Sequence, residues 1–364
     1  MIHEFGHYIV AKLMGVRVNE FAIGMGPKLL KKRVGETEYT LRALPFGGFC
    51  AMEGEDEGAP APTALGGNAG REPDPAAAGD KSRAFGSKKV WQRILIVVAG
   101  VTMNLLLGYV LLLADCAFLQ EPYDDKGTVL FGTTTIARLA ETSPAYQSGL
   151  RAGDTVLSVN GRRMVLDSDL LIEMQSDPDG ILEMTVRRTV DGKPTTLTLD
   201  AVEFERLTDE KTGQNYLKYD FYILGVPRTF GNTFTQAAKE ELSMATLVWR
   251  SLADIVRGRY HLNDLSGPVG TVGIIADVVG DATSQRGLEQ LVYLLSLLTI
   301  NLGVMNLLPF PGLDGGRLCF LVFEGITRRR IPPKWEGIVN LVGLALLMLL
   351  MLVITYSDIF KLFV

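Results

Sequence analysis

The sequence predicts a multi-pass α-helical membrane protein that also contains β-rich segments. Its 364 residues are 47% hydrophobic and their mean hydropathy is +0.20, which is high for a water-soluble enzyme of this length. Three apolar runs without a charged residue lie at 94–114, 291–313 and 338–356. Each is close to the ~20 residues that cross a hydrocarbon core. A buried core helix is the alternative for each run, but three such runs in one chain favour membrane helices.

The first segment, 1–15, is expected to be an apolar helix that carries the pattern His-Glu-x-x-His. His3 and His7 are four residues apart, so on a helix their imidazoles share one face and can bind one metal ion. Glu4 lies beside that face, where it can take a proton from a water molecule whose pKa a bound zinc ion lowers to about 7. Two histidines on a helix face beside an exposed glutamate remain the alternative until a third ligand is found.

This first helix is too short to cross a membrane. Fourteen helical residues reach about 21 Å, whereas the hydrocarbon core is about 30 Å thick. We therefore expect about four transmembrane helices, of which the first is truncated at its N-terminal side. The flanks and the length of the apolar run do not fit a signal peptide.

Short alternating strands follow at 16–50, and Gly24, Gly26, Gly47 and Gly48 punctuate them. This pattern predicts one or two β-hairpins directly after the first helix. The next segment, 51–90, is expected to be a flexible loop, because seventeen of the twenty-seven residues at 54–80 are glycine, proline or alanine. The second transmembrane helix is expected at 91–119.

Lysine and arginine placement predicts the orientation of the chain. Thirteen of these residues lie from Lys12 to Arg93, and five more, from Arg317 to Lys334, lie in a short loop expected after Leu313, so both segments are expected in the cytoplasm. The stretch from about 120 to 290 is then outside. The net charge of −5 averages over both compartments, and we expect no nucleic-acid partner. The three cysteines are scattered and indicate no disulfide framework.

Residues 127–202 resemble a PDZ domain. The order and spacing of Ser143-Pro144-Ala145, Gly153-Asp154 and the Val-Leu-Ser-Val-Asn-Gly run at 156–161 carry this resemblance. Phe131-Gly132-Thr133 matches the usual carboxylate-binding loop only loosely, so capture of a free C-terminus is not expected, whereas peptide binding by strand addition stays open. The segment 203–290 is expected to add strands and an amphipathic helix, and His261 within it is not expected to bind metal.

A third ligand is expected at the end of the third transmembrane helix, 291–314. Pro309 and Pro311 must break this helix and free backbone groups at membrane depth. Asp314 follows, and a carboxylate at the bilayer centre costs roughly 2.5–3.5 kcal/mol, so it needs a partner. A metal ion on His3 and His7 would be that partner, and both motifs are expected near the cytoplasmic face. The fourth transmembrane helix is expected at 338–357.

The two motifs, His-Glu-x-x-His and Asn-x-x-Pro-x-Pro-x-x-Asp-Gly from Asn306, resemble those of the site-2 proteases, which are intramembrane zinc metalloproteases. A PDZ-like domain between them is typical of the bacterial regulator-of-sigma-factor branch. The resemblance covers nearly the whole chain and includes Gly100-x-x-x-Asn104, Asn301 and Ser266-Gly267-Pro268. Val101 and Arg317 depart from the common pattern, where many members have proline and histidine.

The resemblance implies particular roles for the site residues. Zinc would be bound by His3, His7 and Asp314. Glu4 would be the catalytic base, and Asn306 would assist substrate binding or stabilise the oxyanion. The hairpins from Phe21 to Gly48 would enter the membrane and hold an unwound substrate strand by edge pairing; the residues expected to contact that strand are Gly24, Gly26, Gly47, Gly48 and Asn306.

The resulting functional prediction is a zinc-dependent endopeptidase that cleaves transmembrane segments near the cytoplasmic side of a bacterial cell membrane. The resemblance implies anti-sigma factors or signal-peptide remnants as substrates, and a PDZ-like domain outside the cell that excludes untrimmed ones. The alternative is a catalytically inactive, membrane-anchored PDZ adaptor, which the presence of all three ligands and Glu4 disfavours. A soluble gluzincin-type peptidase conflicts with the three apolar runs.

Overall fold

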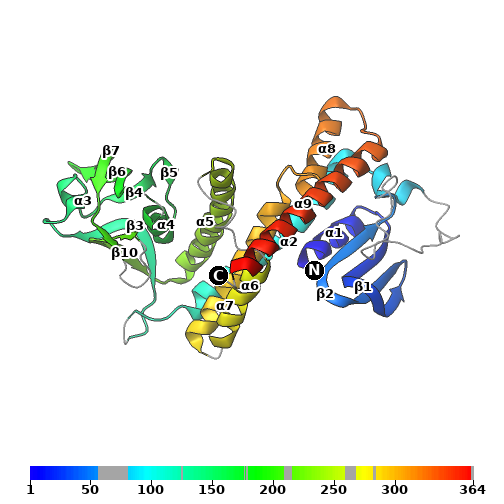
Figure 1. Ribbon diagram of the computed structural model, residues 1–364, viewed down its shortest axis with the longest axis horizontal. Helices are drawn as coiled ribbons and strands as arrows, with labels where there is room; N and C mark the ends of the chain where they lie inside the picture. Colours follow the sequence, from blue (N-terminus) through cyan, green and yellow to red (C-terminus); the bar gives the residue numbers. More distant parts are fainter. Residues whose placement is uncertain are drawn as a thin grey trace. The chain divides into compact units, whose positions relative to one another are not determined.

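A computed structural model describes residues 1–55, 81–123, 126–175, 177, 179–208, 215–258, 268–281 and 284–361. The chain divides into two compact units, of which one comprises Met1–Leu111 with Met244–Val364 and the other Leu112–Ser243. The longer helices are α1 (Ile2–Leu13), α2 (Val90–Ala114), α5 (Phe230–Val256), α6 (Pro268–Asp281), α7 (Gln285–Asn306), α8 (Asp314–Thr327) and α9 (Pro333–Lys361) (Figure 1). Most of the predicted loop at 51–90 and all of His261 and Ser266-Gly267 lie outside the described residues.

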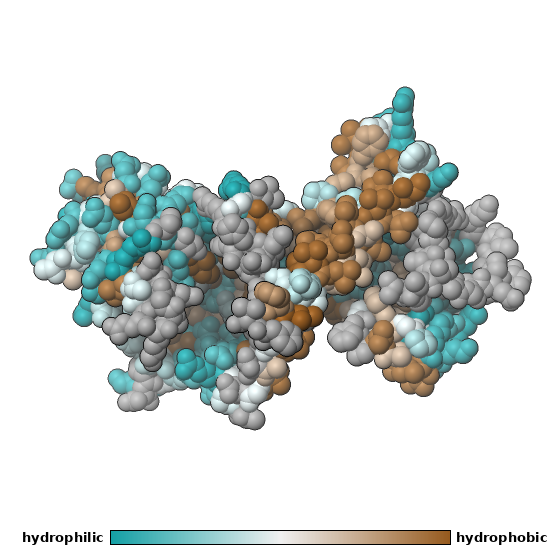
Figure 2. All heavy atoms as spheres, viewed as in Figure 1, coloured by the Kyte–Doolittle hydropathy of each residue, from teal (hydrophilic) through white to brown (hydrophobic). Residues whose placement is uncertain are grey.

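Three helices in the described part of the chain are long and apolar enough to cross a membrane. They cover Val90–Leu119, Gln285–Asn306 and Lys334–Phe360. Only 6% of the most apolar window of the last one is buried, and Figure 2 shows the hydrophobic surface that runs along α9. An apolar face of this size requires lipid or protein around it. The prediction of a membrane protein with several apolar helices and β-sheets is thus confirmed, whereas the fourth, truncated span remains a prediction.

Three helices, α6, α7 and α8, differ from the sequence-based expectation. The third apolar run does not continue to Asp314, because α7 ends at Asn306 and the two prolines lie in the turn that follows. Asp314 is instead the first residue of α8, in a stretch where the arginines led us to expect a loop. Helix α6 also was not predicted; it begins at Pro268, a residue well suited to the first turn of a helix.

Strands β1 (Val18–Val34) and β2 (Thr37–Met52) form one antiparallel sheet in the region of the predicted hairpins. Both strands bend, so that residues 18–23 pair with 48–52 on one side and with 38–41 on the other, and 28–34 pair with 37–42. The bend in β1 occurs at Gly24, whose φ is +84° and whose Cβ, if present, would lie 2.3 Å from the Leu44 carbonyl oxygen. Only glycine fits there, because an L side chain would be both strained and blocked.

The turn of this sheet is tied to its surroundings by Glu36. Its carboxylate accepts hydrogen bonds from Lys12 at 2.6 Å and from both Arg83 guanidinium nitrogens at 2.7 and 2.8 Å. These two cations lower the pKa of Glu36 to about 2.

Stability should therefore depend on Glu36 in an acidic range. The folded-state pKa is depressed, so the contribution is complete above the ordinary value near 4.5 and is lost as the pH falls towards 2. We expect Glu36→Gln to lower the unfolding free energy by about 0.5–1 kcal/mol at pH 7, since the ion pairs are partly exposed. Thermal unfolding of both proteins in detergent from pH 7 to 3 measures this. A difference that stays constant as the pH falls would contradict the assignment.

The core of the first unit holds the helices that matter for the site. It joins Ala11 of α1, Ile96 and Val97 of α2 and Leu321 of α8 with the base of the β1–β2 sheet. An ion pair of 2.5 Å between Arg93 and Glu324, both largely buried, also links α2 to α8. The packing therefore brings the start of α8 towards α1, although more than 300 residues separate them in sequence.

The second unit contains a sheet in the order β10–β3–β4–β6–β7, formed by Phe221–Pro227, Leu130–Leu139, Thr155–Val159, Ile181–Val190 and Lys193–Glu203. The short β5 (Arg162–Arg163) pairs with β4, and β8 (Arg206–Thr208) and β9 (Asn215–Leu217) form a separate two-stranded sheet. Helices α3 (Pro144–Gln147) and α4 (Asp167–Gln175) also belong to this unit. Strand β10 lies beyond the predicted domain boundary at 202. It returns to pair with β3 and sets Gly225 opposite Gly132, so this edge at Phe131-Gly132-Thr133 is occupied by the chain itself.

Candidate metal centre

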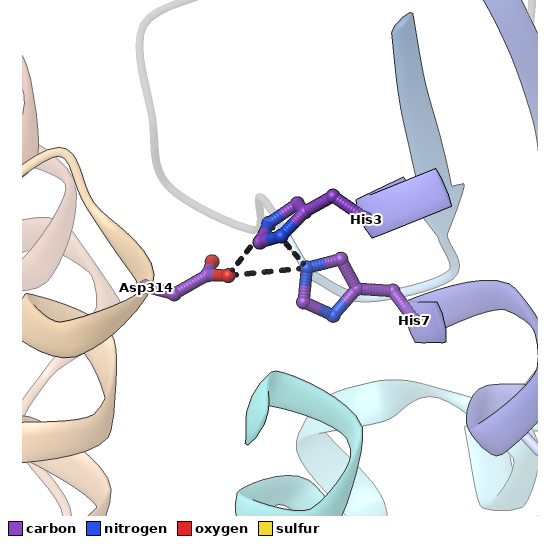
Figure 3. Close-up of side chains that lie close together, drawn as sticks. All are labelled: His3, His7 and Asp314. Carbon is purple, nitrogen blue, oxygen red and sulfur yellow. Dashed lines mark hydrogen bonds and ion pairs between the residues drawn. The ribbon is translucent and has the colours of Figure 1, made fainter. Parts of the chain in front are cut away.

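Three side chains from two distant helices converge on one point. Asp314 Oδ2 lies 2.9 Å from His3 Nε2 and 3.2 Å from His7 Nε2, and the two imidazole nitrogens are 3.1 Å apart (Figure 3). His3 and His7 extend from successive turns of α1, and Asp314 opposes them from the start of α8. The structure thus brings together all three predicted ligands.

The arrangement fits a zinc ion. Donor atoms about 2.0–2.1 Å from a tetrahedral zinc ion are about 3.3 Å from each other, close to the three distances found here. Asp314 Oδ2 is buried and accepts no hydrogen bond from the described residues, although both imidazoles point at it. Two nitrogens and a carboxylate oxygen are also donors that zinc prefers. These three residues would hold the metal and leave a fourth position for water or substrate.

Helix α2 contacts both histidines at Nδ1, on the side of each ring away from Asp314. His7 Nδ1 lies 2.7 Å from the Ile96 carbonyl oxygen, which can only accept a hydrogen bond, so Nδ1 carries the proton and Nε2 is left with a lone pair. The side-chain amide of Asn104 lies 3.4 Å from His3 Nδ1. Such outer partners hold imidazoles in the tautomer and orientation that a metal needs. The Ile96 carbonyl was not predicted, because a backbone group leaves no signal in the sequence.

Replacing Asn104 should weaken metal binding without breaking the fold. We expect Asn104→Leu, which keeps the volume but removes the amide, to lower zinc affinity about 10–100-fold. Competition with a chromogenic chelator measures this affinity directly. Thr102→Ala is the matched control, since Thr102 lies on the exposed side of the same helix turn. Equal affinities for the two variants would show that Asn104 does not orient His3.

Close approach of α2 to α1 depends on glycine. A Cβ built on Gly100 would lie 2.4 Å from His7 Nε2 and 2.8 Å from His3 Cε1. Likewise, a Cβ on Gly6 would lie 2.4 Å from the Ala99 carbonyl oxygen. The two helices therefore meet where neither has a side chain, and the imidazoles fill the space next to Gly100.

Glu4 lies on α1 directly after His3, one of the three candidate ligands, and is half-buried. Its Oε2 accepts a hydrogen bond of 3.2 Å from the Cys50 backbone N–H, which belongs to the outer segment of β2. That segment, 48–52, pairs with β1 on one side only among the described residues. The carboxylate is thus held next to a strand edge, a contact that the sequence did not predict because it involves a backbone donor.

The other predicted site residues are not drawn into this cluster. Asn306 is the last residue of α7, and its side chain makes no hydrogen bond within the described part of the chain. Gly26 and Gly47 have positive φ angles at the bends of the β1–β2 sheet, as Gly24 does, and a Cβ on Gly48 would lie 2.6 Å from the Ala22 carbonyl oxygen. These glycines have a structural reason to be there, and their contact with substrate stays a prediction. Arg317 forms an ion pair with Glu55.

The comparison with known proteins decides the family. The family model described as peptidase family M50 matches residues 1–350. The chain belongs to this family. The predicted identification as a site-2 protease, a zinc metalloprotease of membranes, is thereby confirmed.

Curated relatives agree over nearly the full length. The zinc metalloprotease RasP of Shouchella clausii is 32% identical over 100% of this chain and 96% of its own length. The regulator of sigma-W protease RasP of Bacillus subtilis is 31% identical over 99% of this chain and 95% of its own. RasP of Bacillus licheniformis is 32% identical over 99% and 96%. With its apolar helices, the M50 peptidase described here is a bacterial membrane protein that uses zinc.

A second group of ligand-type side chains, Asp115, Cys116 and Glu240, lies in the other unit within 4.8 Å. The Cys116 thiol donates to Glu240 at 3.6 Å, and the Gln236 amide donates to the same carboxylate at 3.0 Å. Hydrogen bonding accounts for the Cys116 thiol and the Glu240 carboxylate, so we assign this group no metal.

Proposed function

We propose that this M50 peptidase is an intramembrane endopeptidase whose reaction centre consists of His3, His7, Asp314 and Glu4. The observation that carries the proposal is the convergence of the three donor atoms within 3.2 Å, with the Glu4 carboxylate on the same helix. A zinc ion held there supplies a Lewis acid and lowers the pKa of water.

Glu4 is the proton carrier in this proposal. Glu4 directly follows His3 in α1, so its carboxylate lies beside the proposed metal position. The hydrogen bond from the Cys50 N–H restricts rotation of the Glu4 side chain. It removes a proton from the attacking water and delivers one to the leaving amine. Asn306 is proposed to donate a hydrogen bond from its side-chain amide to the developing oxyanion once substrate is bound. It comes from the helix end that precedes the Asp314 turn, and its amide has no competing hydrogen bond among the described residues.

The outer segment of β2 is proposed to hold the substrate. Residues 48–52 have one paired edge, and the Cys50 N–H on this segment already reaches Glu4. An extended substrate segment that adds to the other edge would lie beside the carboxylate. A peptide bond within an intact helix is shielded by its own hydrogen bonds, so substrates must be transmembrane helices that unwind readily.

We further propose four transmembrane helices, a reaction centre near the cytoplasmic face and a PDZ-like domain outside. The Lys and Arg distribution supports this orientation. Anti-sigma factors and signal-peptide remnants are the proposed substrates, and the name of the Bacillus subtilis relative, regulator of sigma-W protease, supports the first class.

Reconstituted protein tests this function. The purified chain in lipid nanodiscs is incubated with single-span substrates that differ only in a central Gly-Pro or Leu-Leu pair, and products are identified by mass spectrometry. We expect cleavage inside the apolar segment, faster with Gly-Pro, abolished by chelation and restored by zinc. A zinc-loaded protein that binds the substrates but cuts none of them would support the inactive adaptor instead. Cleavage confined to soluble peptides would contradict an intramembrane site.

A further inference from the structure

An open groove of about 280 Å³ crosses one face of the β1–β2 sheet, and none of the candidate metal ligands lines it. Its floor is apolar, formed by Phe21, Ile23, Leu30, Tyr39 and Leu41. The strand register places Leu30 opposite Leu41 and brings the segment that begins at Lys28 alongside them. A shallow apolar channel on the face of a sheet is therefore exposed.

Two lysines flank this groove. Lys31 and Lys32 line it, both are exposed, and neither forms an ion pair with any residue that the structure describes. Lys28 on the same segment differs, since its ammonium group is 2.6 Å from Glu38 and 3.4 Å from Glu20. Among the described residues, Lys31 and Lys32 thus leave uncompensated positive charge along this strand, and as neighbours in β1 they project to opposite faces of the sheet.

Exposed leucines accompany these charges. Leu29 and Leu30 are 63% and 67% exposed, and Leu44 is 54% exposed. In Figure 2, hydrophobic and hydrophilic atoms adjoin at the lower edge of the β1–β2 sheet. Exposed leucines are unfavourable in water, whereas leucines next to lysines suit the boundary between acyl chains and anionic headgroups, where both kinds of group find a partner.

We propose that this groove binds an anionic phospholipid. An acyl chain would lie over Leu30 and Leu41, while the headgroup phosphate would lie at the open edge of segment 28–34, which Lys32 reaches from the groove side and Lys31 from the opposite face. Charge complementarity favours this occupant: a zwitterionic lipid brings its own cation, and an apolar peptide gains nothing from two lysines. The inference does not depend on the proposed reaction, because none of these residues belongs to the reaction centre.

Native mass spectrometry of the full chain tests the proposal. Protein in mild detergent is mixed with equal amounts of phosphatidylglycerol and phosphatidylcholine, and the lipid retained on the folded protein is counted. We expect the parent to retain phosphatidylglycerol preferentially. The double variant Lys31→Gln/Lys32→Gln should bind it roughly thirty-fold more weakly, because two cations near an anionic surface are together worth about 2 kcal/mol.

The matched control is Lys193→Gln/Lys239→Gln, which removes two exposed lysines elsewhere and should leave the preference unchanged. Leu30→Gln should weaken retention of both lipids, because it makes the floor of the groove polar. Equal retention of phosphatidylglycerol by the parent and the groove double variant would overturn the proposal. Failure of the parent to discriminate between the two lipids would also overturn it. The same holds if the groove double variant binds lipid normally and differs only in forming fewer dimers by light scattering.

Discussion

Glu4→Gln is expected to lower proteolysis of a transmembrane substrate by about 10²–10⁴-fold while leaving zinc in place. The carboxylate is the acceptor for the proton of the attacking water, and an amide of the same size cannot take that proton. The hydrogen bond from the Cys50 N–H can still be accepted by the amide oxygen, so the local structure should persist. Single-turnover cleavage in nanodiscs, with zinc measured by atomic emission on the same sample, provides both numbers.

Two comparisons make this result specific. Glu4→Asp keeps the carboxylate, although the side chain is one methylene shorter and the carboxylate therefore lies farther from the metal position. This variant should retain more activity than Glu4→Gln. Glu20→Gln serves as a control, because Glu20 pairs with Arg42 in the sheet and is absent from the metal-binding cluster. A zinc-loaded Glu4→Gln protein that cleaves as fast as the parent would exclude Glu4 as the base.

Gly100→Ala is expected to remove zinc and lower activity at least about 100-fold. The added Cβ would lie 2.4 Å from His7 Nε2 and 2.8 Å from His3 Cε1, closer than any real contact allows, so the imidazoles or α2 must shift. A displacement near 1 Å at a reacting centre costs about 100-fold in rate. The decisive measurement is zinc content after gel filtration, together with the cleavage rate.

Gly325→Ala is the matched control for this prediction. It also introduces one methyl group on a helix of the same unit, but the nearest atom to its Cβ is a Val90 side-chain carbon at 3.5 Å, an ordinary contact. Ala also favours the helix, so this control should unfold no earlier than the parent. Normal zinc content in Gly100→Ala would mean that the histidines do not lie against α2 as described.

The sequence by itself determined the class of protein and singled out the three side chains that we propose as metal ligands. The apolar runs predicted three membrane helices, because the number of residues that spans a bilayer is set by its thickness and needs no tertiary information. His3 and His7 could be paired because four residues make about one helical turn. Asp314 could be proposed because an acid at the edge of an apolar run needs a partner.

Tertiary structure alone decided how those residues are held. Ile96 and Cys50 contribute a backbone carbonyl and a backbone N–H, which all residue types except proline possess, so no residue pattern could reveal them. The resemblance included Gly100, but the reason why this position must lack a side chain is visible only in the structure, where α1 crosses α2 at that level.

Helix α8 and strand β10 show a second limit. The arginines after Asp314 indicated a loop, yet packing of Leu321 into a core shared with α1 and α2 makes this segment helical and brings Asp314 to His3 and His7. Strand β10 pairs with β3 across some ninety residues, outside the range of any local pattern. Local periodicity and composition specify which residues can do the chemistry. Where these residues come together depends on contacts between residues far apart in the sequence, which local patterns do not encode.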